Sequence, residues 1–222
     1  MTHLKNRNDG FTLVEMLVAM AIGAIVMAAV YSTYTTQQKS YILQEQVGAM
    51  QQNIRAGMYY MARDIRMAGC DPTGNANAGI TAAGPTSISF TRDIRTGMDP
   101  TNNTADGRTD GWNEAVTYAY NAATDQITRG GQALAENIDA LDFVYLDPNN
   151  NVLNPGQTSV PSANIPNIQS VQITIVARTG RGDQQYVNSN SFANQQDVQI
   201  LAPQNDNFHR KILTSNIRCR NL

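Results

Sequence analysis

The residue whose type and position have the clearest chemical meaning is Glu15, the only charged residue between Phe11 and Val30. Thr12 is the only other clearly polar residue of that run. Twenty helical residues rise about 30 Å, the thickness of a bilayer's hydrocarbon core, so the run predicts a membrane-spanning helix. A carboxylate within such a helix is costly. It indicates either a tolerated charge near the membrane interface or a functional group that requires a positive partner.

The residues that precede the apolar run form a short basic leader that ends at Gly10. Lys5 and Arg7 favour retention of this end in the cytoplasm, so the rest of the chain would follow the helix outward. The leader, Gly10, the stretch Phe11–Glu15 and the apolar helix together resemble the class III signal of type IV pilins and type II secretion pseudopilins. In that family a prepilin peptidase cuts after the glycine and methylates the new N-terminus.

This resemblance implies a role for three residues. Cleavage falls between Gly10 and Phe11, Phe11 becomes the methylated N-terminus, and Glu15 is the acidic residue needed for assembly. In the filament, Glu15 would pair with the ammonium of a neighbouring subunit. An unpaired charge is heavily penalised in a low-dielectric setting, so the pair would fix the axial register of the subunits. An ordinary secretory signal is cleaved after its apolar segment, whereas here that segment would stay on the mature protein.

The two cysteines, Cys70 and Cys219, have a spacing that matches no zinc motif. Both follow the predicted membrane span, which places them outside the cytoplasm, where disulfides persist. A Cys70–Cys219 disulfide would close a loop of about 150 residues, for which the chain-entropy model gives a stabilisation on the order of 4–5 kcal/mol. The alternative is two buried free thiols that behave as small hydrophobic residues.

Other residues that could do chemistry form weaker patterns. An oxygen-rich loop contains Asp99, Asn102, Asn103, Asp106 and Asp110. Calcium prefers such ligands, but the spacing differs from the EF-hand loop and is ordinary for turns, so no metal is predicted. His3 leaves with the leader, and His209 has no identifiable nucleophile as partner. No phosphate loop or dinucleotide motif is present, so the sequence predicts neither an enzyme nor a cofactor.

The helix that presents Glu15 is predicted to continue past the membrane over residues 11–68. Beyond the apolar run, hydrophobic residues recur at steps of three or four, the helical period, namely Val47, Met50, Ile54, Met58, Met61 and Ile65. Gly69 is the predicted stop. The second half is therefore amphipathic and expected to lie against a globular head, with the Met-rich stripe as core rather than as a binding groove.

The end of this helix, Arg63–Gly69, resembles the PilW-type minor pilins, which are related to the J-type pseudopilin of type II secretion. The segment Leu134–Asp147 and the tail Ile217–Leu222 resemble the same family. Arg63, Asp64 and Arg66 are interpreted as a solvated helix end with i,i+3 charge pairs.

The residues after Cys70 predict a mainly antiparallel β head. Strands are expected at 87–91, 115–120, 126–128, 141–146, 171–177 and 211–219, and loops at 72–85, 98–112 and 148–166. The polar stretch 178–208 is expected to be loosely ordered. The predicted fold is α+β and pilin-like, a long N-terminal helix packed against a β head. Its organisation is a cleaved leader (1–10), a helix (11–68, with 11–30 in the membrane or filament core) and a head (69–222).

The function implied by the resemblance is that of a minor pilin, processed by prepilin peptidase, that takes part in type IV pilus assembly. The alternatives are a type II secretion pseudopilin, or a tip subunit that mediates adhesion or DNA binding. A net charge of −2 gives no broad basic face for nucleic acid. The expected partners are other major and minor pilins, through the helix. The expected location is the inner membrane, single-pass with a periplasmic head, and then the extracellular pilus, with adhesion and twitching motility as associated processes.

Overall fold

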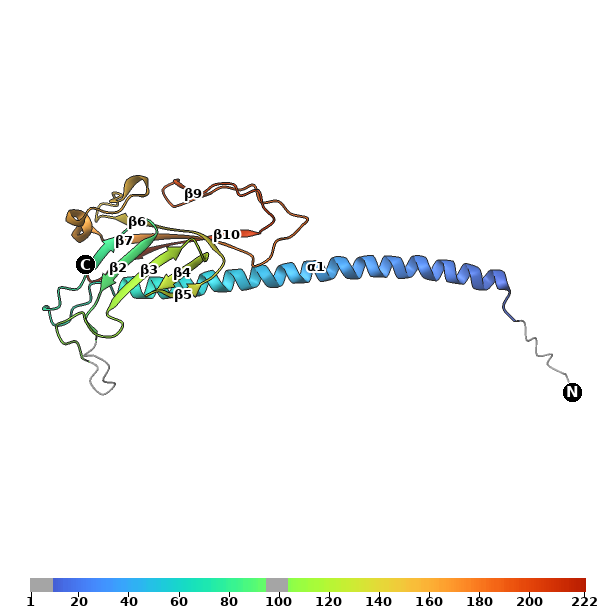
Figure 1. Ribbon diagram of the computed structural model, residues 1–222, viewed down its shortest axis with the longest axis horizontal. Helices are drawn as coiled ribbons and strands as arrows, with labels where there is room; N and C mark the ends of the chain where they lie inside the picture. Colours follow the sequence, from blue (N-terminus) through green and yellow to red (C-terminus); the bar gives the residue numbers. More distant parts are fainter. Residues whose placement is uncertain (1–9, 95–103) are drawn as a thin grey trace. The chain divides into compact units, whose positions relative to one another are not determined.

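The computed structural model describes residues 10–94 and 104–222 of the chain. The chain divides into two compact units, one that ends at Glu45 and one that comprises Gln46–Leu222. Helix α1, Leu13–Arg66, is the long helix in Figure 1. Its first part belongs to the first unit and its last part to the second. The long predicted helix is therefore present, two residues shorter at each end than expected.

The end of α1 is fixed by Gly69, which has a left-handed backbone conformation with φ of +76°. A Cβ atom there would lie 2.5 Å from Cδ2 of Leu222 and 2.7 Å from the backbone oxygen of Asn221. The Asn221 side chain also donates a hydrogen bond to the carbonyl of Arg66, at 3.3 Å. Glycine is thus required both for the turn and for the close approach of the C-terminal tail.

The first sheet of the head is an antiparallel five-stranded sheet with the strand order β1-β2-β3-β4-β5. Its strands are β1 (Ile80–Ala83), β2 (Ser87–Thr91), β3 (Ala115–Asn121), β4 (Gln126–Arg129) and β5 (Gln132–Ala135). The strand predictions at 87–91, 115–120 and 126–128 are confirmed. The loop prediction for 72–85 is wrong for β1, which pairs with β2 and buries Ile80 and Ala83. A four-residue strand shows too little alternation to be recognised from sequence.

The second sheet has the strand order β10-β7-β6 and is also antiparallel. Its strands are β6 (Ile138–Leu146), β7 (Ser170–Arg178) and β10 (Arg210–Arg218). β6 and β7 contain the strands predicted at 141–146 and 171–177, and β10 includes all but the last residue of the strand predicted at 211–219. β8 (Phe192–Ala193) and β9 (Gln199–Leu201) pair as a two-stranded ribbon. The predicted loop 148–166 contains the 3₁₀ turn η1 (Pro155–Gln157) and all but the last residue of a second 3₁₀ turn, η2 (Ser162–Asn167). The α+β prediction is confirmed.

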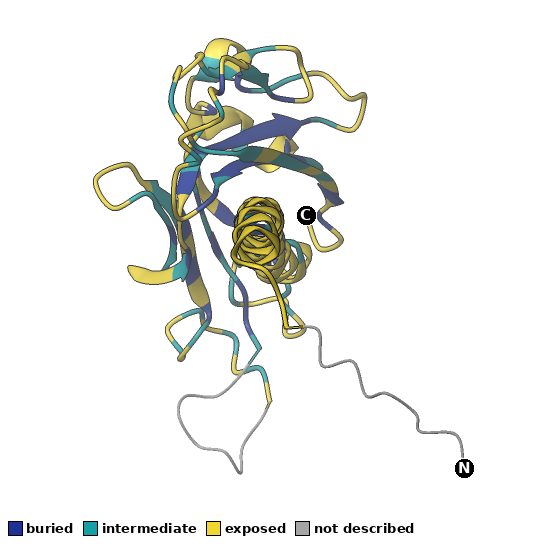
Figure 2. Ribbon diagram, turned by 90° about the vertical axis from the view of Figure 1, so that its right-hand side faces the viewer, coloured by how far each residue is buried: buried dark blue, intermediate teal, exposed yellow. Residues whose placement is uncertain are grey.

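The core of the head lies between the sheets and the last part of α1. The buried stripe of the helix consists of Met50, Ile54, Met58, Met61 and Ile65. It forms one apolar cluster with strand residues that include Phe90, Tyr118, Phe143, Ile173 and Ile175. Buried residues concentrate in the central strands, whereas the outer loops are exposed (Figure 2). The Met-rich stripe is therefore core, as predicted.

The polar segment that follows β7 is ordered, so the prediction of loose order for 178–208 is wrong. Arg178 forms ion pairs with Asp125, at 2.6 Å, and with Asp139. Arg210 pairs with Asp139 at 2.6 Å and with Asp206 at 2.5 Å. Polar residues inside the segment have partners in the folded head: Asp206 pairs with Arg210 of β10, and the Asn194 side chain donates to Asp142, 52 positions away in sequence, at 2.8 Å.

Candidate assembly site at the start of the long helix

The predicted assembly carboxylate, Glu15, lies in the first turn of α1 and closes a capping box with Thr12. Oε2 of Glu15 accepts hydrogen bonds from the backbone N–H of Thr12, at 2.8 Å, and from its Oγ1, at 2.9 Å. The backbone N–H of Glu15 in turn donates to Oγ1 of Thr12, at 3.2 Å. Each residue thus satisfies a donor that the helix end would leave free. The pattern Thr-x-x-Glu before an apolar run is a local signal in the sequence from which this capping box could have been predicted.

The predicted cleavage position lies just before this capping box. Gly10, Phe11 and Thr12 precede α1 and are not helical, and 86% of the Phe11 surface is exposed. Apart from its chain neighbours, no described residue has a heavy atom within 4 Å of the position that a Cβ atom on Gly10 would occupy. A non-helical, exposed peptide bond between a glycine and a phenylalanine is accessible to a peptidase.

The residues after the capping box present apolar side chains that the chain itself does not cover. All residues from Gly10 to Tyr34 are exposed, including Phe11, Leu13, Val14, Leu17, Ile22, Ile25, Val26 and Val30. Within the described residues α1 is the one helix whose length and composition would allow it to cross a membrane. An apolar surface of this length is unstable in water, so it requires either lipid or other helices as its surroundings.

The last turns of α1 are attached to the five-stranded sheet by a buried charge cluster around Asp64. Oδ1 of Asp64 lies 3.2 Å from the guanidinium of Arg92, and Oδ2 lies 2.8 Å from that of Arg129. Oδ2 also accepts a hydrogen bond from the hydroxyl of Tyr118, at 2.8 Å. Asp64 is 1% exposed, so its interpretation as part of a solvated helix end is wrong. Asp64 also lies 3.5 Å from its exposed neighbour Arg63, but its buried partners Arg92 and Arg129 are 28 and 65 positions away in sequence and gave no local signal.

The cluster shifts the ionisation of its members in opposite directions. Burial alone would raise the pKa of Asp64, but hydrogen bonds from Tyr118 and Arg129 and the charge of Arg92 outweigh it and lower that pKa. Burial and the hydrogen bond to Asp64 raise the pKa of Tyr118 well above its usual value. Asp64 is therefore a carboxylate and Tyr118 a neutral hydrogen-bond donor at neutral pH.

The two cysteines are free thiols in the structure, Cys70 half-buried and Cys219 buried. Burial raises the pKa of the Cys219 thiol to about 11, which keeps it protonated and slow to react. Their surroundings are close: Gly69, next to Cys70, contacts Asn221 and Leu222, which follow Cys219 in the tail. The Cys70–Cys219 disulfide stays a prediction.

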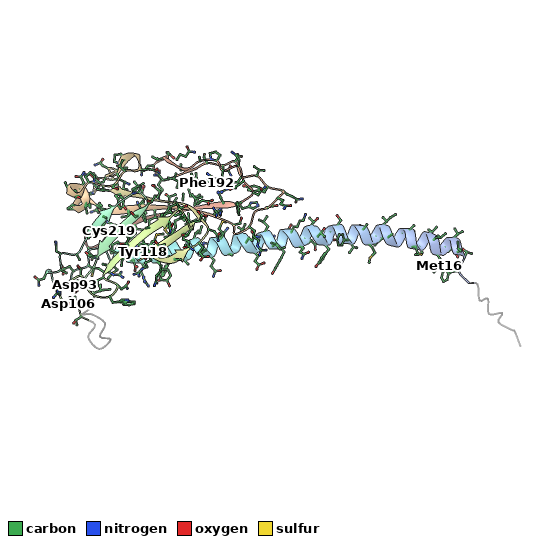
Figure 3. All side chains as sticks on the ribbon, in the orientation of Figure 1. Met16, Asp93, Asp106, Tyr118, Phe192 and Cys219 are labelled. Atoms are coloured by element: carbon green, nitrogen blue, oxygen red, sulfur yellow. The ribbon has the colours of Figure 1, made fainter. Side chains whose placement is uncertain are left out.

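The oxygen-rich loop and His209 have structural partners where they are described. Asp99, Asn102 and Asn103 lie outside the described residues. The backbone N–H of Asp106 donates to Oδ1 of Asp93, at 3.1 Å, and both lie at one end of the head (Figure 3). Asp110 pairs with Arg108 at 3.0 Å, on the surface. His209 stacks on Tyr186, with ring centroids 3.9 Å apart, and its Nε2 lies 3.3 Å from Oδ2 of Asp183.

Comparison with protein families gives two matches. The prokaryotic N-terminal methylation motif matches residues 5–31. The model of the type IV pilus-assembly protein W family matches residues 97–221, more than half of the chain. The chain belongs to the PilW family. A PilW-type chain with a methylation motif is a minor pilin that acts in type IV pilus assembly, and this family points to a structural rather than an enzymatic role.

Two further comparisons add little to the PilW assignment. A type IV-like pilin from Thermus thermophilus is 11% identical to this chain, with a TM-score of 0.49. That alignment covers 81% of this chain and 98% of the other. A search among curated proteins gave no match.

Proposed function

We propose that this minor pilin is cut between Gly10 and Phe11, is methylated at Phe11, and enters the pilus through pairing of Glu15 with the ammonium of a neighbouring subunit. The observation that best supports this is the capping box itself. It uses Oε2 of Glu15, and no described residue donates a hydrogen bond to Oε1. One carboxylate oxygen thus holds the helix start while the other is left for a partner.

The same proposal includes the route of the chain. The leader 1–10 stays on the cytoplasmic side, residues 11–30 span the inner membrane once, and the head is periplasmic before the subunit enters the extracellular pilus. The exposed apolar surface of α1 supports this, because it requires lipid first and neighbouring pilin helices afterwards. The family match favours a pilus over a type II secretion system.

The pairing role is tested with two substitutions at one position. Glu15→Gln removes the charge but keeps an oxygen for the capping box, whereas Glu15→Ala removes both. We expect both variants to be processed and inserted, and Glu15→Gln to be depleted from the pilus fraction because the neighbour's ammonium lacks its anion. Quantitative immunoblots of membrane and sheared pilus fractions provide the measurement. Wild-type incorporation of Glu15→Gln would show that the charge has no role in assembly.

The cleavage site is tested by mass spectrometry of the protein from pilus fractions. We expect an N-terminus at Phe11 with one methyl group, and unprocessed precursor for Gly10→Leu. Gly48→Leu is a matched control, because Gly48 is also an exposed glycine without neighbours within 4 Å of its Cβ position. An N-terminus at any other residue contradicts the proposed site.

We also propose that Cys70 and Cys219 form a disulfide in the exported protein. The contact between Gly69, which precedes Cys70, and the tail that follows Cys219 supports it, because it brings the two segments side by side. The test is thiol labelling of the denatured, non-reduced protein. No labelling before reduction and two labelled thiols after it is the expected result, whereas two labelled thiols before reduction would exclude the bridge.

A further inference from the structure

The outer face of the β10-β7-β6 sheet is covered by loops rather than by helix. Along β6, Phe143 and Tyr145 belong to the core that contains α1, while Asp142 and Val144 alternate with them and are buried outside that core. The segment around η1 and the β8–β9 ribbon lie over this outer face. A second buried layer, partly polar, is therefore present on the side of the sheet away from the core.

A cavity of about 160 Å³ lies within this layer. Its apolar wall includes Val144, Val152 and Val198, and its polar groups include Asp142, Asn194 and Gln157. A cavity of about 150 Å³ is large enough for a benzene molecule, which has six heavy atoms. The cavity is too small for a drug-sized ligand but suits a single side chain or a short amine.

The carboxylate of Asp142 is the only charged group among the residues that line the cavity, and it is 2% exposed. Nδ2 of Asn194 donates to its Oδ2 at 2.8 Å, and Nε2 of Gln157 reaches its Oδ1 only at 3.4 Å. None of the ion pairs among the described residues includes Asp142. Burial raises the pKa of Asp142, which Asn194 offsets only in part. A buried carboxylate with amide partners alone lacks the compensating charge that such groups normally have.

The edge of the cavity next to Oδ1 of Asp142 is formed by two residues with a left-handed backbone, a conformation that residues other than glycine rarely adopt. Gln157 has a φ of +59° and follows Gly156, whose φ is +66°. Non-glycine residues in this region are strained and cluster at ligand clamps and switch regions. The strained turn places the Gln157 amide next to Asp142 but at a distance typical of a weak hydrogen bond. A stronger donor could therefore displace it from Oδ1.

We propose that this cavity binds a primary ammonium group on a short aliphatic stem, which is the chemistry of a lysine side chain. A lysine side chain has five heavy atoms, which fits the volume, and its stem would lie against the valine wall. The ammonium has three donors and a full positive charge, so it would satisfy Oδ1 and neutralise Asp142. This inference concerns the head and does not depend on assembly through Glu15.

The test uses the full chain in detergent micelles and two small probes of equal length, n-butylammonium chloride and 1-butanol. We expect saturable binding of n-butylammonium, seen as shifts of the valine methyl signals of Val144, Val152 and Val198 in NMR spectra. Butanol should bind at least about tenfold more weakly, because it lacks the charge. Equal binding of the two probes, or binding of neither, overturns the proposal.

Two variants locate the binding. Asp142→Asn should weaken n-butylammonium binding at least about tenfold. Asp197→Asn is the matched control: it removes the same charge nearby, from an exposed residue whose left-handed φ of +57° asparagine tolerates. If Asp142→Asn does not fold, n-butylammonium binding is measured with Val198→Phe instead. This variant fills the cavity and leaves the carboxylate in place, so it should also weaken the binding. Unchanged binding in the folded variant overturns the assignment to this cavity.

A third probe distinguishes the source of the ammonium group. Nα-acetyl-lysine methylamide presents the same stem on a peptide backbone. Binding of both this probe and n-butylammonium indicates a lysine of another protein chain as ligand. Binding of n-butylammonium alone supports the site but restricts it to free amines.

Discussion

Asp64 and Asp142 are both almost fully buried carboxylates of the head, but one lies in the core layer and the other in the outer layer. Asp64 is surrounded by Arg92, Arg129 and Tyr118, and its pKa is lowered. Asp142 has only amide partners, and its pKa is raised. The difference shows that burial alone does not give a carboxylate its role. The partners decide whether it holds an element in place or is left for a ligand.

The largest expected effect is that of Asp64→Asn. The substitution leaves Arg92, which is 5% exposed, and Arg129 without their counter-ion. Breaking a buried ion pair in this way destabilises a protein by about 3–5 kcal/mol. Urea unfolding of the full chain in detergent, followed by circular dichroism, measures the loss. Asp110→Asn, at an exposed ion pair, is the control and should change little. A loss for Asp64→Asn no larger than that of the control would remove the distinction between the two carboxylates.

A smaller effect is expected when either arginine is replaced by methionine. Arg92→Met and Arg129→Met each leave Asp64 with the other of these two arginines and with the exposed Arg63, which lies 3.5 Å from its Oδ1. Each should therefore reduce the free energy of unfolding by about 2 kcal/mol. The double variant leaves Asp64 with the exposed Arg63 as its one charge partner among the described residues. Its loss should therefore exceed the sum of the single losses, which a double-mutant cycle detects. Simple additivity would mean that the two arginines do not act through a shared carboxylate.

Tyr118→Phe should have a smaller effect again. It removes the hydrogen bond that the hydroxyl donates to the charged Asp64 and the longer one, 3.2 Å, that it accepts from Nε of Arg129. We expect this to reduce the free energy of unfolding by about 1.5 kcal/mol. Tyr120→Phe is a matched comparison, because its hydroxyl donates only to the neutral carbonyls of Ile138 and Asp139. The same unfolding measurement applies. A larger loss for Tyr120→Phe than for Tyr118→Phe contradicts the view that the charge of Asp64 strengthens its bond.

Asp142→Asn should change the free energy of unfolding at neutral pH by about 1 kcal/mol or less, and in the stabilising direction. Because the pKa of Asp142 is raised on folding, its ionised form weakens the fold above that pKa. As the pH falls through the folded pKa towards about 4, wild type should therefore gain stability relative to Asp142→Asn. The contribution of Asp64 to stability has the opposite pH dependence, since it is lost as the pH falls through the lowered pKa of Asp64. If the free energies of unfolding of wild type and Asp142→Asn change in parallel with pH, ionisation of Asp142 does not destabilise the fold.

The parts of this fold that were predictable are those with a local pattern. β2 was recognisable from strict alternation in Ser87–Thr91, and the helix stop from Gly69, whose left-handed backbone disfavours any other residue. Glu15 stood out because it is a charge in an apolar run. The role of Asp64 was hidden because it depends on residues that only the folded sheet brings close. β1 was hidden because pairing with β2, rather than its own four residues, makes it a strand.

The outer layer could not be predicted for the same reason: it depends on contacts between residues that are distant in sequence. Asp142 occupies a polar position in a well-recognised alternating strand, which in sequence indicates exposure to solvent. The loops that cover it, around Gln157 and Asn194, have no periodic pattern and were expected to be irregular or loosely ordered. Their order comes from side-chain hydrogen bonds such as those of Asn194 to Asp142, and to the backbone of Gln196 and Val198. Sequence periodicity contains no information about such contacts.

The capping box of Thr12 and Glu15 has a consequence for the charge at the start of α1 before the subunit is assembled. Cleavage after Gly10 would place an ammonium next to the positive end of the α1 macrodipole, where a cation is unfavourable. The Glu15 carboxylate, held over this end by Thr12, would offset that charge within the same chain. In assembly, the other carboxylate oxygen would then add a pair between two subunits to this compensation within one. The carboxylate would thus serve both as a shield for the monomer and as a contact in the filament.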